Sequence, residues 1–352
     1  MGNISSNGTN GTATYSDVFR YAGIAASPLS AIGLLANLFM LMVLSNRFHF
    51  SKTTYNLIRV SVISDSISCF TSAACYILMV VYRLDVNDGR IVCRTIIFTT
   101  MTSYGISMMT LAIIAIDRYF AVVRPFLSVY HSKKSRIILF SEIQVWIISA
   151  AVCVPLLFYV NVYPDDPIFC DFPEVTLNKS IYLFVFTLIL YFIPSTAIII
   201  TYWRIIMHQR QSIRPGYISD ERRYRDETKK KKFIGVLTSI ASSYLLTTWP
   251  FFVAILSMAI KQVSGRNLVK NNLMLFLLLF YSMTVTLSIT IMSPFLYIKF
   301  DKNIRAESIR IFKRCCCKSL SENNSVILIS SAKHYHSDHL SPIVTIKDSK
   351  LN

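Results

Sequence analysis

Asp65 and the adjacent pair Asp117-Arg118 are ionisable residues in, or at the end of, long apolar segments of this sequence. A charge in apolar surroundings is costly unless it is paired or serves a function. Asp117 and Arg118 fall where the third long apolar segment runs into a basic loop, at the expected edge of the membrane. Asp65 lies near mid-membrane and is therefore a functional candidate, and the alternative is a neutral acid hydrogen-bonded to Asn37. Each role depends on helices that hold these residues at a defined depth.

Enzymatic chemistry is not indicated by the same segments. An intramembrane enzyme needs paired acids, a His/Glu metal set or a Ser/Lys pair within its spans, and the apolar segments contain none of these sets. All six His residues are expected in loops or in the tail. A secondary transporter would show internal repeats and Gly/Pro-broken half-helices around a midplane site, and we find no repeat.

Seven long apolar segments organise the chain, which is 53% hydrophobic and only 16% charged. They lie near residues 21–45, 55–82, 93–120, 136–160, 180–207, 233–260 and 271–298. A helix needs roughly 20 apolar residues to cross a bilayer, and the bilayer leaves no other way to satisfy the backbone of so long a segment. The predicted fold is therefore an all-α membrane protein, a seven-transmembrane helix bundle. The longest connection is expected at 208–232, where Pro215-Gly216 would break any helix.

The net charge of +17 follows the predicted topology. With the N-terminus outside, all but eight of the 36 Lys and Arg residues fall on the cytoplasmic side or at its boundary. This positive-inside bias predicts an extracellular N-terminus and a cytoplasmic C-terminus. The basic excess then indicates topology and contact with anionic membrane lipids, whereas nucleic-acid binding is not expected because no reader motif accompanies the charge.

The segment 1–20 is predicted to be extracellular and glycosylated. It carries acceptor sequons at Asn3, Asn7 and Asn10, and a further sequon at Asn178 would also lie outside. The segment lacks the apolar core of a cleavable signal, so the first span must itself direct insertion. We therefore expect a multi-pass protein of the plasma membrane.

Polar and proline residues recur in these spans at characteristic positions. Twenty-five residues separate Cys93 from Arg118, and eight separate Pro194 from Tyr202. After Asp117-Arg118-Tyr119 the chain continues as Ala121-Val122-Val123-Arg124-Pro125-Phe126. The set comprises Asn37, Asp65, Ser107, Arg118, Trp146, Pro194, Tyr202, Trp249, Pro250, Ser293, Pro294 and Tyr297. In this set the sequence resembles the rhodopsin-like (class A) G-protein-coupled receptors, and the region 104–126 is most similar to neuropeptide receptors.

The resemblance implies a receptor domain over 21–298 and a conformational switch. Arg118 would pair with Asp117 at rest and swing toward Tyr202 and Tyr297 on activation. Pro125 and Phe126 would contact the heterotrimeric G protein. The switch set is Asp117, Arg118, Tyr119, Tyr202, Trp249, Pro250, Pro294 and Tyr297. Prolines 194, 250 and 294 would loosen spans five, six and seven for this motion.

The sequence departs from the family pattern in several places. Lys230 occupies the position of an acid that helps to hold Arg118 at rest, which predicts measurable basal signalling. Thr248 occupies the usual place of the switch tryptophan, and Trp249 is adjacent to Pro250. The family's allosteric sodium ion would be held by Asp65 and Ser107, but Ile289 and Ser293 replace polar ligands.

The cysteines are expected to fall into three groups. Cys93 opens the third span and Cys170 lies in the next extracellular loop, so both are in an oxidising location and are predicted to pair. Cys69, Cys75 and Cys153 are predicted to pack within spans. Residues 299–314 form a short basic amphipathic helix, the eighth, suited to the inner leaflet. It leads to Cys315, Cys316 and Cys317, where palmitoylation is expected and zinc binding is the alternative, in a cytoplasmic tail over 315–352.

The ligand cleft expected from the resemblance is apolar and aromatic. Its residues are Thr100, Met101, Tyr104, Phe186, Leu190, Phe251, Phe252, Ile255, Met283 and Leu287. Thr100 replaces the Asp that amine receptors use, and Leu287 replaces the retinal Lys of opsins. Acids of the loop 161–179 would complement a basic peptide, or would only solvate that loop. A peptide is the expected ligand, and a lipid or small chemosensory molecule is the alternative; arrestin and receptor kinases are further expected partners.

Overall fold

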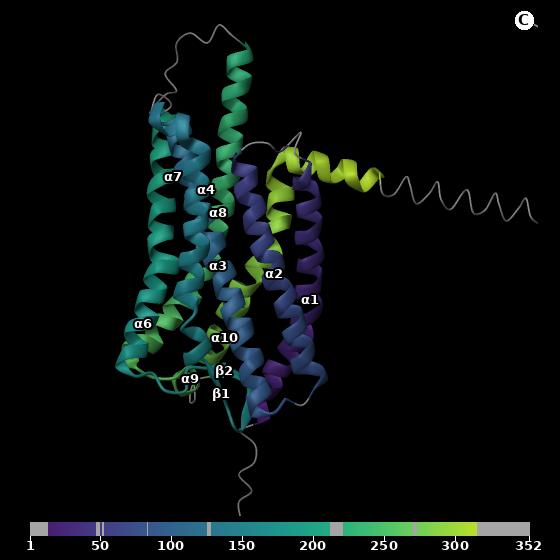
Figure 1. The fold of residues 1–352 in the computed structure, drawn as a ribbon, viewed down its shortest axis with the longest axis vertical. Coiled ribbons are helices and arrows are strands. Elements are labelled where there is room, and N and C mark those ends of the chain that lie inside the picture. Colours follow the sequence, from purple (N-terminus) through teal and green to yellow (C-terminus); the bar gives the residue numbers. More distant parts are fainter. Residues whose placement is uncertain are drawn as a thin grey trace, which may run out of the picture. The chain divides into compact units, whose positions relative to one another are not determined.

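A computed structural model describes residues 13–46, 50, 53–82, 84–124, 128–211, 221–269 and 273–314. The chain separates into two compact units, Met1–Arg305 and Ala306–Asn352. The first unit is a bundle of long helices with a small hairpin at one end (Figure 1). We call this the hairpin end, and we call the other end, where α7 finishes and α8 starts, the opposite end.

The elements of the first unit follow one another along the chain as an up-and-down bundle. The long helices are α1 (Ala13–Ser45), α2 (Thr53–Val81), α3 (Val86–Val122), α4 (Ser128–Cys153), α6 (Leu177–Thr187) continued through a π turn η1 (Leu188–Phe192) into α7 (Ile193–Gln211), α8 (Glu221–Lys261) and α10 (Leu273–Phe300). The short elements are α5 (Leu156–Tyr159), β1 (Asn161–Tyr163), β2 (Asp166–Asp171) and α9 (Gly265–Val269). The two strands pair antiparallel.

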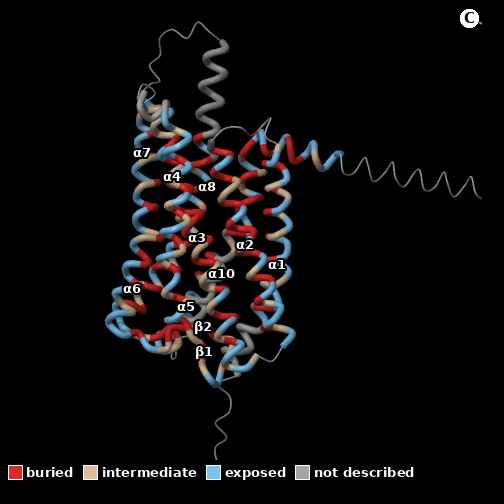
Figure 2. Tube along the Cα trace, in the orientation of Figure 1, coloured by how far each residue is buried: buried red, intermediate tan, exposed pale blue. Residues whose placement is uncertain are grey.

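The outer face of the bundle is apolar. Leu35, Phe140, Trp203 and Leu246 are each at least 64% exposed, although such side chains avoid water. Figure 2 shows exposed positions on the outside of the helices and buried positions facing the middle. Six helical segments in the described part of the chain are long and apolar enough to cross a membrane, and α10 is of similar length at 28 residues. The exposed apolar surface is the surface that a bilayer would cover.

Helix α3 is the centre of the bundle. It packs against α2, α4 and α7 and against both strands of the hairpin. Asp85 caps its N-terminus by accepting a hydrogen bond from the Asp88 backbone N–H at 2.7 Å. Because α3 touches so many neighbours, its side chains occupy most of the sites described below.

The structure corrects the predicted elements at several places; α1, for example, begins at Ala13, within the segment 1–20 that was predicted to precede the first span. The connection predicted at 208–232 is much shorter, because α7 continues to Gln211 and α8 begins at Glu221. The expectation that every His lies in a loop or the tail is therefore wrong for His208 on α7 and for His131 on α4. The predicted span 136–160 ends at Cys153, and the chain then turns through Pro155 into α5. The hairpin in the loop 161–179 was not predicted.

The predicted eighth helix is helical where it is described. Backbone of residues 302–305 in the first unit and 306–314 in the second unit is helical. Within the second unit Arg310 pairs with Glu307 at 2.6 Å. Whether this segment lies on a lipid surface stays a prediction.

Candidate functional site

The ion pair expected between Asp117 and Arg118 is present at the opposite end of α3. Asp117 is buried, with 1% of its side chain exposed. Its Oδ1 also accepts from the Nζ of Lys134 on α4 at 2.5 Å. The carboxylate is thus held by two cations from two helices, and the Lys134 partner was not predicted. Two cations give Asp117 a partner even when one of them moves away.

Asp65 on α2 lies at the centre of the bundle and is fully buried. Its Oδ1 accepts hydrogen bonds from Ser107 at 3.0 Å and from Ser103 at 3.2 Å. Ser107 also shares a hydrogen bond with Ser61 at 2.9 Å. The Oδ2 atom is buried with no hydrogen bond within the described part of the chain, and the Ser293 hydroxyl lies near the carboxylate. A carboxylate among hydroxyl oxygens is a donor set that fits a hard cation such as sodium.

The alternative partner expected for Asp65 was Asn37, and the structure shows other contacts there. The Asn37 amide donates to the carbonyls of Gly33 at 2.9 Å and of Thr290 at 3.1 Å. It therefore ties α1 to α10 rather than neutralising the Asp65 carboxylate. The expectation of an Asn37–Asp65 hydrogen bond is wrong for this reason.

A second buried contact links α8 to α10 in the same region. The hydroxyls of Tyr244 and Ser293 are 2.5 Å apart, and Ser293 directly precedes Pro294. Tyr202 and Tyr297, the residues expected to receive Arg118, are both buried. Tyr244 was not among the predicted switch residues, although it bridges two of the helices expected to move.

The prolines of the switch lie inside their helices as predicted, Pro250 in α8 and Pro294 in α10. Pro194 is the second residue of α7, two positions after the end of the π turn η1. Proline lacks an N–H and its ring crowds the carbonyl four residues back, so a wider turn relieves that position. Trp249 does not join the switch residues: half of its side chain is exposed, whereas Thr248 is fully buried and faces inward.

Predicted cleft residues on α3, α6 and α8 contact one another in the bundle. Tyr104 donates to the Thr248 hydroxyl at 3.1 Å, and its ring lies 5.3 Å from that of Phe252. Phe252 stacks on Tyr191 at 4.8 Å and lies 6.3 Å from Phe186. Those of the predicted cleft residues that are buried are Thr100, Met101, Tyr104, Phe186, Leu190, Phe251, Phe252 and Ile255.

The predicted disulfide between Cys93 and Cys170 is confirmed, with Cα atoms 5.7 Å apart. It fastens β2 to the start of α3. Gly89 lies one turn earlier, where an added Cβ would stand 2.2 Å from the Pro167 carbonyl oxygen. Glycine is therefore required for the hairpin to approach α3 this closely.

The hairpin also binds the loop that carries α9. Asp171 accepts from the backbone N–H groups of Gly265 at 2.9 Å and Arg266 at 2.8 Å, and from the Tyr163 hydroxyl at 2.9 Å. Arg266 in turn forms a two-point ion pair with Asp165, at 3.0 and 2.5 Å. We call this set of contacts, made by Tyr163, Asp165, Asp171, Gly265 and Arg266, the loop clasp. It joins the connection before α6 to the connection before α10.

The pKa values of acidic groups in the hairpin reflect the loop clasp and the burial around it. The hydrogen bond from Arg266 is the main reason why the pKa of Asp165 lies below its ordinary value. Burial raises the pKa of Tyr163 to about 12, and the nearby Asp171 carboxylate adds to the shift. Burial also raises the pKa of Asp166, whose carboxylate accepts from the Ile168 N–H at 3.3 Å. The loop acids expected to complement a ligand were Asp165, Asp166, Asp171 and Glu174. Of these, Asp165 and Asp171 are engaged within the protein, while Glu174 is exposed.

Glu142 on α4 is a further buried acid that the sequence reasoning missed. It accepts from the Thr110 hydroxyl of α3 at 3.0 Å, and its Oε2 is buried without a hydrogen bond in the described residues. The rule that singled out Asp65, an ionisable residue within an apolar span, would have found it. Lys134 gave no such signal, because it stands at the basic end of its helix.

Several predicted site residues lie outside the described residues. These are Pro125, Phe126, Cys315, Cys316, Cys317, Asn3, Asn7 and Asn10, together with the side chains of Met283, Leu287 and Lys230. Asn178 is described and lies exposed in the first turn of α6.

The sequence profile of the "7 transmembrane receptor (rhodopsin family)" matches residues 36–297. The chain therefore belongs to this family of receptors, and the seven-helix fold and the absence of an enzymatic role follow from that membership. It is 21% identical to the substance-P receptor of Aquarana catesbeiana over 83% of this chain and 70% of the relative. It is 22% identical to the human neuromedin-K receptor over 92% and 68%. It is 27% identical to prokineticin receptor 2 of Rattus norvegicus over 49% and 46%.

Proposed function

We propose that this receptor lies in the plasma membrane and converts binding of an extracellular peptide into activation of a heterotrimeric G protein. The observation that carries the proposal is the buried Asp117 carboxylate, which holds Arg118 at one end of the helix whose other end carries the cleft residues and the disulfide. The neuropeptide receptors among the relatives support a peptide ligand. The basic excess supports a cytoplasmic location for the opposite end.

Helix α3 links the two ends. A ligand that displaces Tyr104 or Phe252 would alter how α3 packs against α8, because their contact crosses between these helices. Release of Arg118 would then open a cavity for the G protein, with Tyr202 and Tyr297 as its new partners. The activated receptor would be the substrate of receptor kinases and the partner of arrestin.

A sodium ion at Asp65 would favour the resting state. Ser103, Ser107 and the unbonded Oδ2 of Asp65 are the oxygens that would hold it. Activity should then fall as sodium rises, and Asp65→Asn should remove that dependence. Equal sodium dependence in Asp65→Asn would exclude this site.

A lipid or small chemosensory ligand is the second candidate. It is favoured by one observation: two of the loop acids that would attract a basic peptide are engaged in the loop clasp. A small apolar ligand needs only the aromatic cleft beneath. Charge-reversed peptide libraries separate the candidates, since only a peptide receptor should respond to peptides at all.

The deciding experiment is G-protein activation in cells across a panel of G-protein reporters, basal and peptide-stimulated. Arg118→Ala should remove the signal, whereas Arg136→Ala, an exposed arginine on α4, should leave it unchanged at equal surface expression. Loss of ligand affinity on adding guanine nucleotide would be an independent sign of coupling. A signal that survives Arg118→Ala would overturn the proposed switch.

A further inference from the structure

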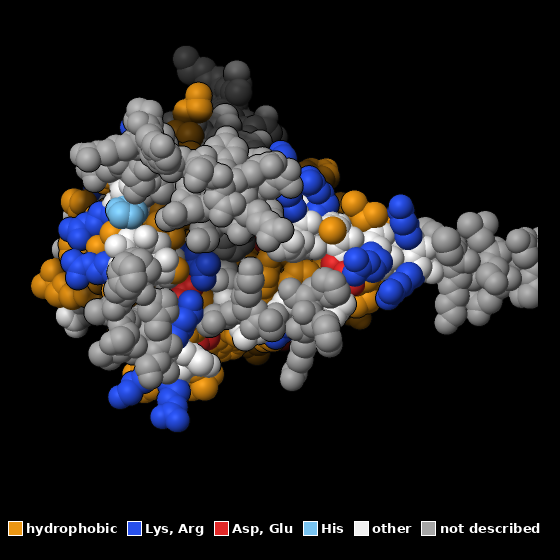
Figure 3. Space-filling view, turned by 90° about the horizontal axis from the view of Figure 1, so that it is seen from above, with side chains coloured by type: hydrophobic (Ala, Val, Ile, Leu, Met, Phe, Trp, Pro, Cys, Tyr) orange, Lys and Arg blue, Asp and Glu red, His pale blue; other side chains and the backbone are white. Residues whose placement is uncertain are grey.

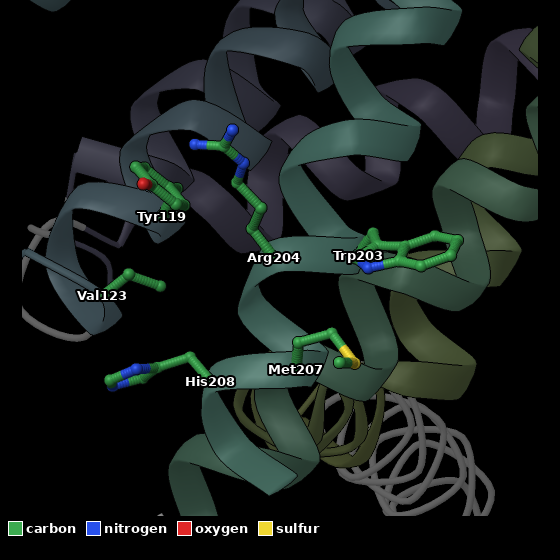
Figure 4. Close-up of a pocket in the computed structure, with 6 residues that line it drawn as sticks. All are labelled: Tyr119, Val123, Trp203, Arg204, Met207 and His208. Atoms are coloured by element: carbon green, nitrogen blue, oxygen red, sulfur yellow. The ribbon is translucent and has the colours of Figure 1, made fainter. Parts of the chain in front are cut away.

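A groove lies between α3 and α7 at the opposite end of the bundle. It measures about 350 Å³ and is lined by Tyr119, Val123, Trp203, Arg204, Met207 and His208 (Figure 4). Tyr119 and Val123 form the α3 wall, and the remaining four residues belong to successive turns of α7. The proposed switch uses Tyr119 alone among these six.

One side of the groove belongs to the lipid-facing surface. Exposed apolar side chains recur along α7 at helical spacing: Ile199, Ile200, Trp203, Ile206 and Met207. Trp203 is 66% exposed, which is unfavourable in water but suits a tryptophan near the membrane interface. An acyl chain could therefore lie against Trp203 and Met207 without leaving the bilayer.

The other side of the groove is basic. Arg204 and His208 are one helical turn apart on α7, and both side chains extend toward α3 in Figure 4. The Tyr119 hydroxyl interacts with Arg204 and Arg124. Figure 3 looks onto this end of the molecule and shows Lys and Arg side chains gathered there beside apolar ones. No carboxylate is among the residues that line this groove in the described structure.

We propose that this groove binds the phosphate of an acidic phospholipid from the cytoplasmic leaflet. Arg204 and His208 would donate to the phosphate oxygens, and Trp203 and Met207 would contact the first part of the acyl chain. The assignment of the leaflet rests on the orientation proposed above. Charge complementarity selects an anionic headgroup, and the lipid-facing position of Trp203 selects a lipid over a free phosphate.

A lipid at this site would touch α3 beside Arg118 and α7 beside Tyr202. It would therefore bridge α3 and α7, whose relative position the proposed switch would change. The affinity for the lipid would therefore differ between the resting and the activated receptor, even when no ligand is bound.

The test is native mass spectrometry of the full chain in neutral detergent, with phosphatidylserine or phosphatidylcholine added. We expect phosphatidylserine to be retained preferentially, and the double variant Arg204→Gln/His208→Gln to retain about tenfold less. The matched control Arg210→Gln removes a charge from the same helix outside the groove and should retain as much as wild type. Equal losses in both variants, or none in the double variant, would overturn the site.

Two further measurements keep the result decisive. A photoactivatable phosphatidylserine should crosslink to wild-type peptides containing residues 119–123 or 203–208, and crosslinks confined to other helices would overturn the site even if the double variant failed to fold. Inorganic phosphate should not displace the lipid; displacement at equal concentration would show an anion site instead. Neither measurement needs G protein or ligand, so failure here leaves the proposed signalling untouched.

Discussion

Asp117 of α3 and Lys134 of α4 form an ion pair, with Nζ and Oδ1 2.5 Å apart, beside the pair that Asp117 makes with Arg118. A buried carboxylate that loses its cation costs several kcal/mol, about 3–5 in measured cases. If Arg118 leaves Asp117 on activation, Lys134 remains and reduces that cost. Lys134 therefore favours the activated arrangement, although it adds to the contacts of the resting one.

Replacing Lys134 should lower basal signalling. In Lys134→Gln, Asp117 would lose the Lys134 cation and keep Arg118, so releasing Arg118 would cost more and Arg118 would be held more firmly at rest. We expect roughly fivefold less basal nucleotide exchange, corresponding to about 1 kcal/mol. Lys133→Gln removes the same charge from an exposed neighbour and is the control. Basal exchange that increases in Lys134→Gln but not in Lys133→Gln would show that Lys134 restrains the receptor instead.

Gly89 should be intolerant of any side chain. The Cβ of Gly89→Ala would lie 2.2 Å from the Pro167 carbonyl oxygen and would force the hairpin away from α3. Overpacking of this kind costs about 1–3 kcal/mol. The melting temperature of the purified receptor should fall accordingly.

Gly235→Ala serves as the glycine control, because open space surrounds that position and alanine favours a helix. It should leave the melting temperature unchanged or slightly raised. Equal melting temperatures of Gly89→Ala and Gly235→Ala would mean that the hairpin can move away from α3 without loss of stability.

The loop clasp should protect the backbone of α9. Asp171→Ala removes the acceptor for the N–H groups of Gly265 and Arg266, and hydrogen bonds to a charged group contribute about 1.5–3 kcal/mol. Hydrogen exchange at these two amides should accelerate at least tenfold. Glu174→Ala, an exposed acid of the same loop, should not change it. Unchanged exchange in Asp171→Ala would mean that other contacts order α9.

The Asp165–Arg266 pair should persist at mildly acidic pH. Since the folded pKa of Asp165 is lowered, its contribution to stability is present above the unfolded value of about 3.9 and is lost as pH falls through the folded pKa. The difference in melting temperature between wild type and Asp165→Asn should stay constant from pH 7 to about pH 4 and then shrink. A difference that disappears between pH 7 and 5 would implicate Asp166, whose pKa burial raises.

The helices and the disulfide could be predicted because their signals are local. Apolar length places the spans, and the positions of Cys93 and Cys170 place both on one side of the membrane. The hairpin could not be predicted, because a strand as short as Asn161–Tyr163 contains too few residues to show the polar/apolar pattern of a strand. The pairing of Lys134 depends on how α4 packs against α3, which no local pattern specifies.

Trp249 shows that a shift of one residue along a helix changes the direction in which a side chain points. Successive residues of a helix point about 100° apart. Thr248 and Trp249 therefore cannot both face the cleft, and the fully buried Thr248 takes the place that meets Tyr104. The sequence showed the departure from the family pattern but not which residue would turn inward.

The π turn η1 has a consequence for the phase of its helix. Phe186 and Tyr202 are sixteen residues apart, which in an uninterrupted α-helix would place them roughly 160° apart around the axis. Yet both are buried in the bundle, Phe186 against Phe252 and Tyr202 toward the opposite end. The wider turn between them absorbs the surplus rotation. A deletion of one residue within Leu188–Phe192 would therefore restore a regular helix and leave the two rings roughly 60° apart, still on one side of the helix.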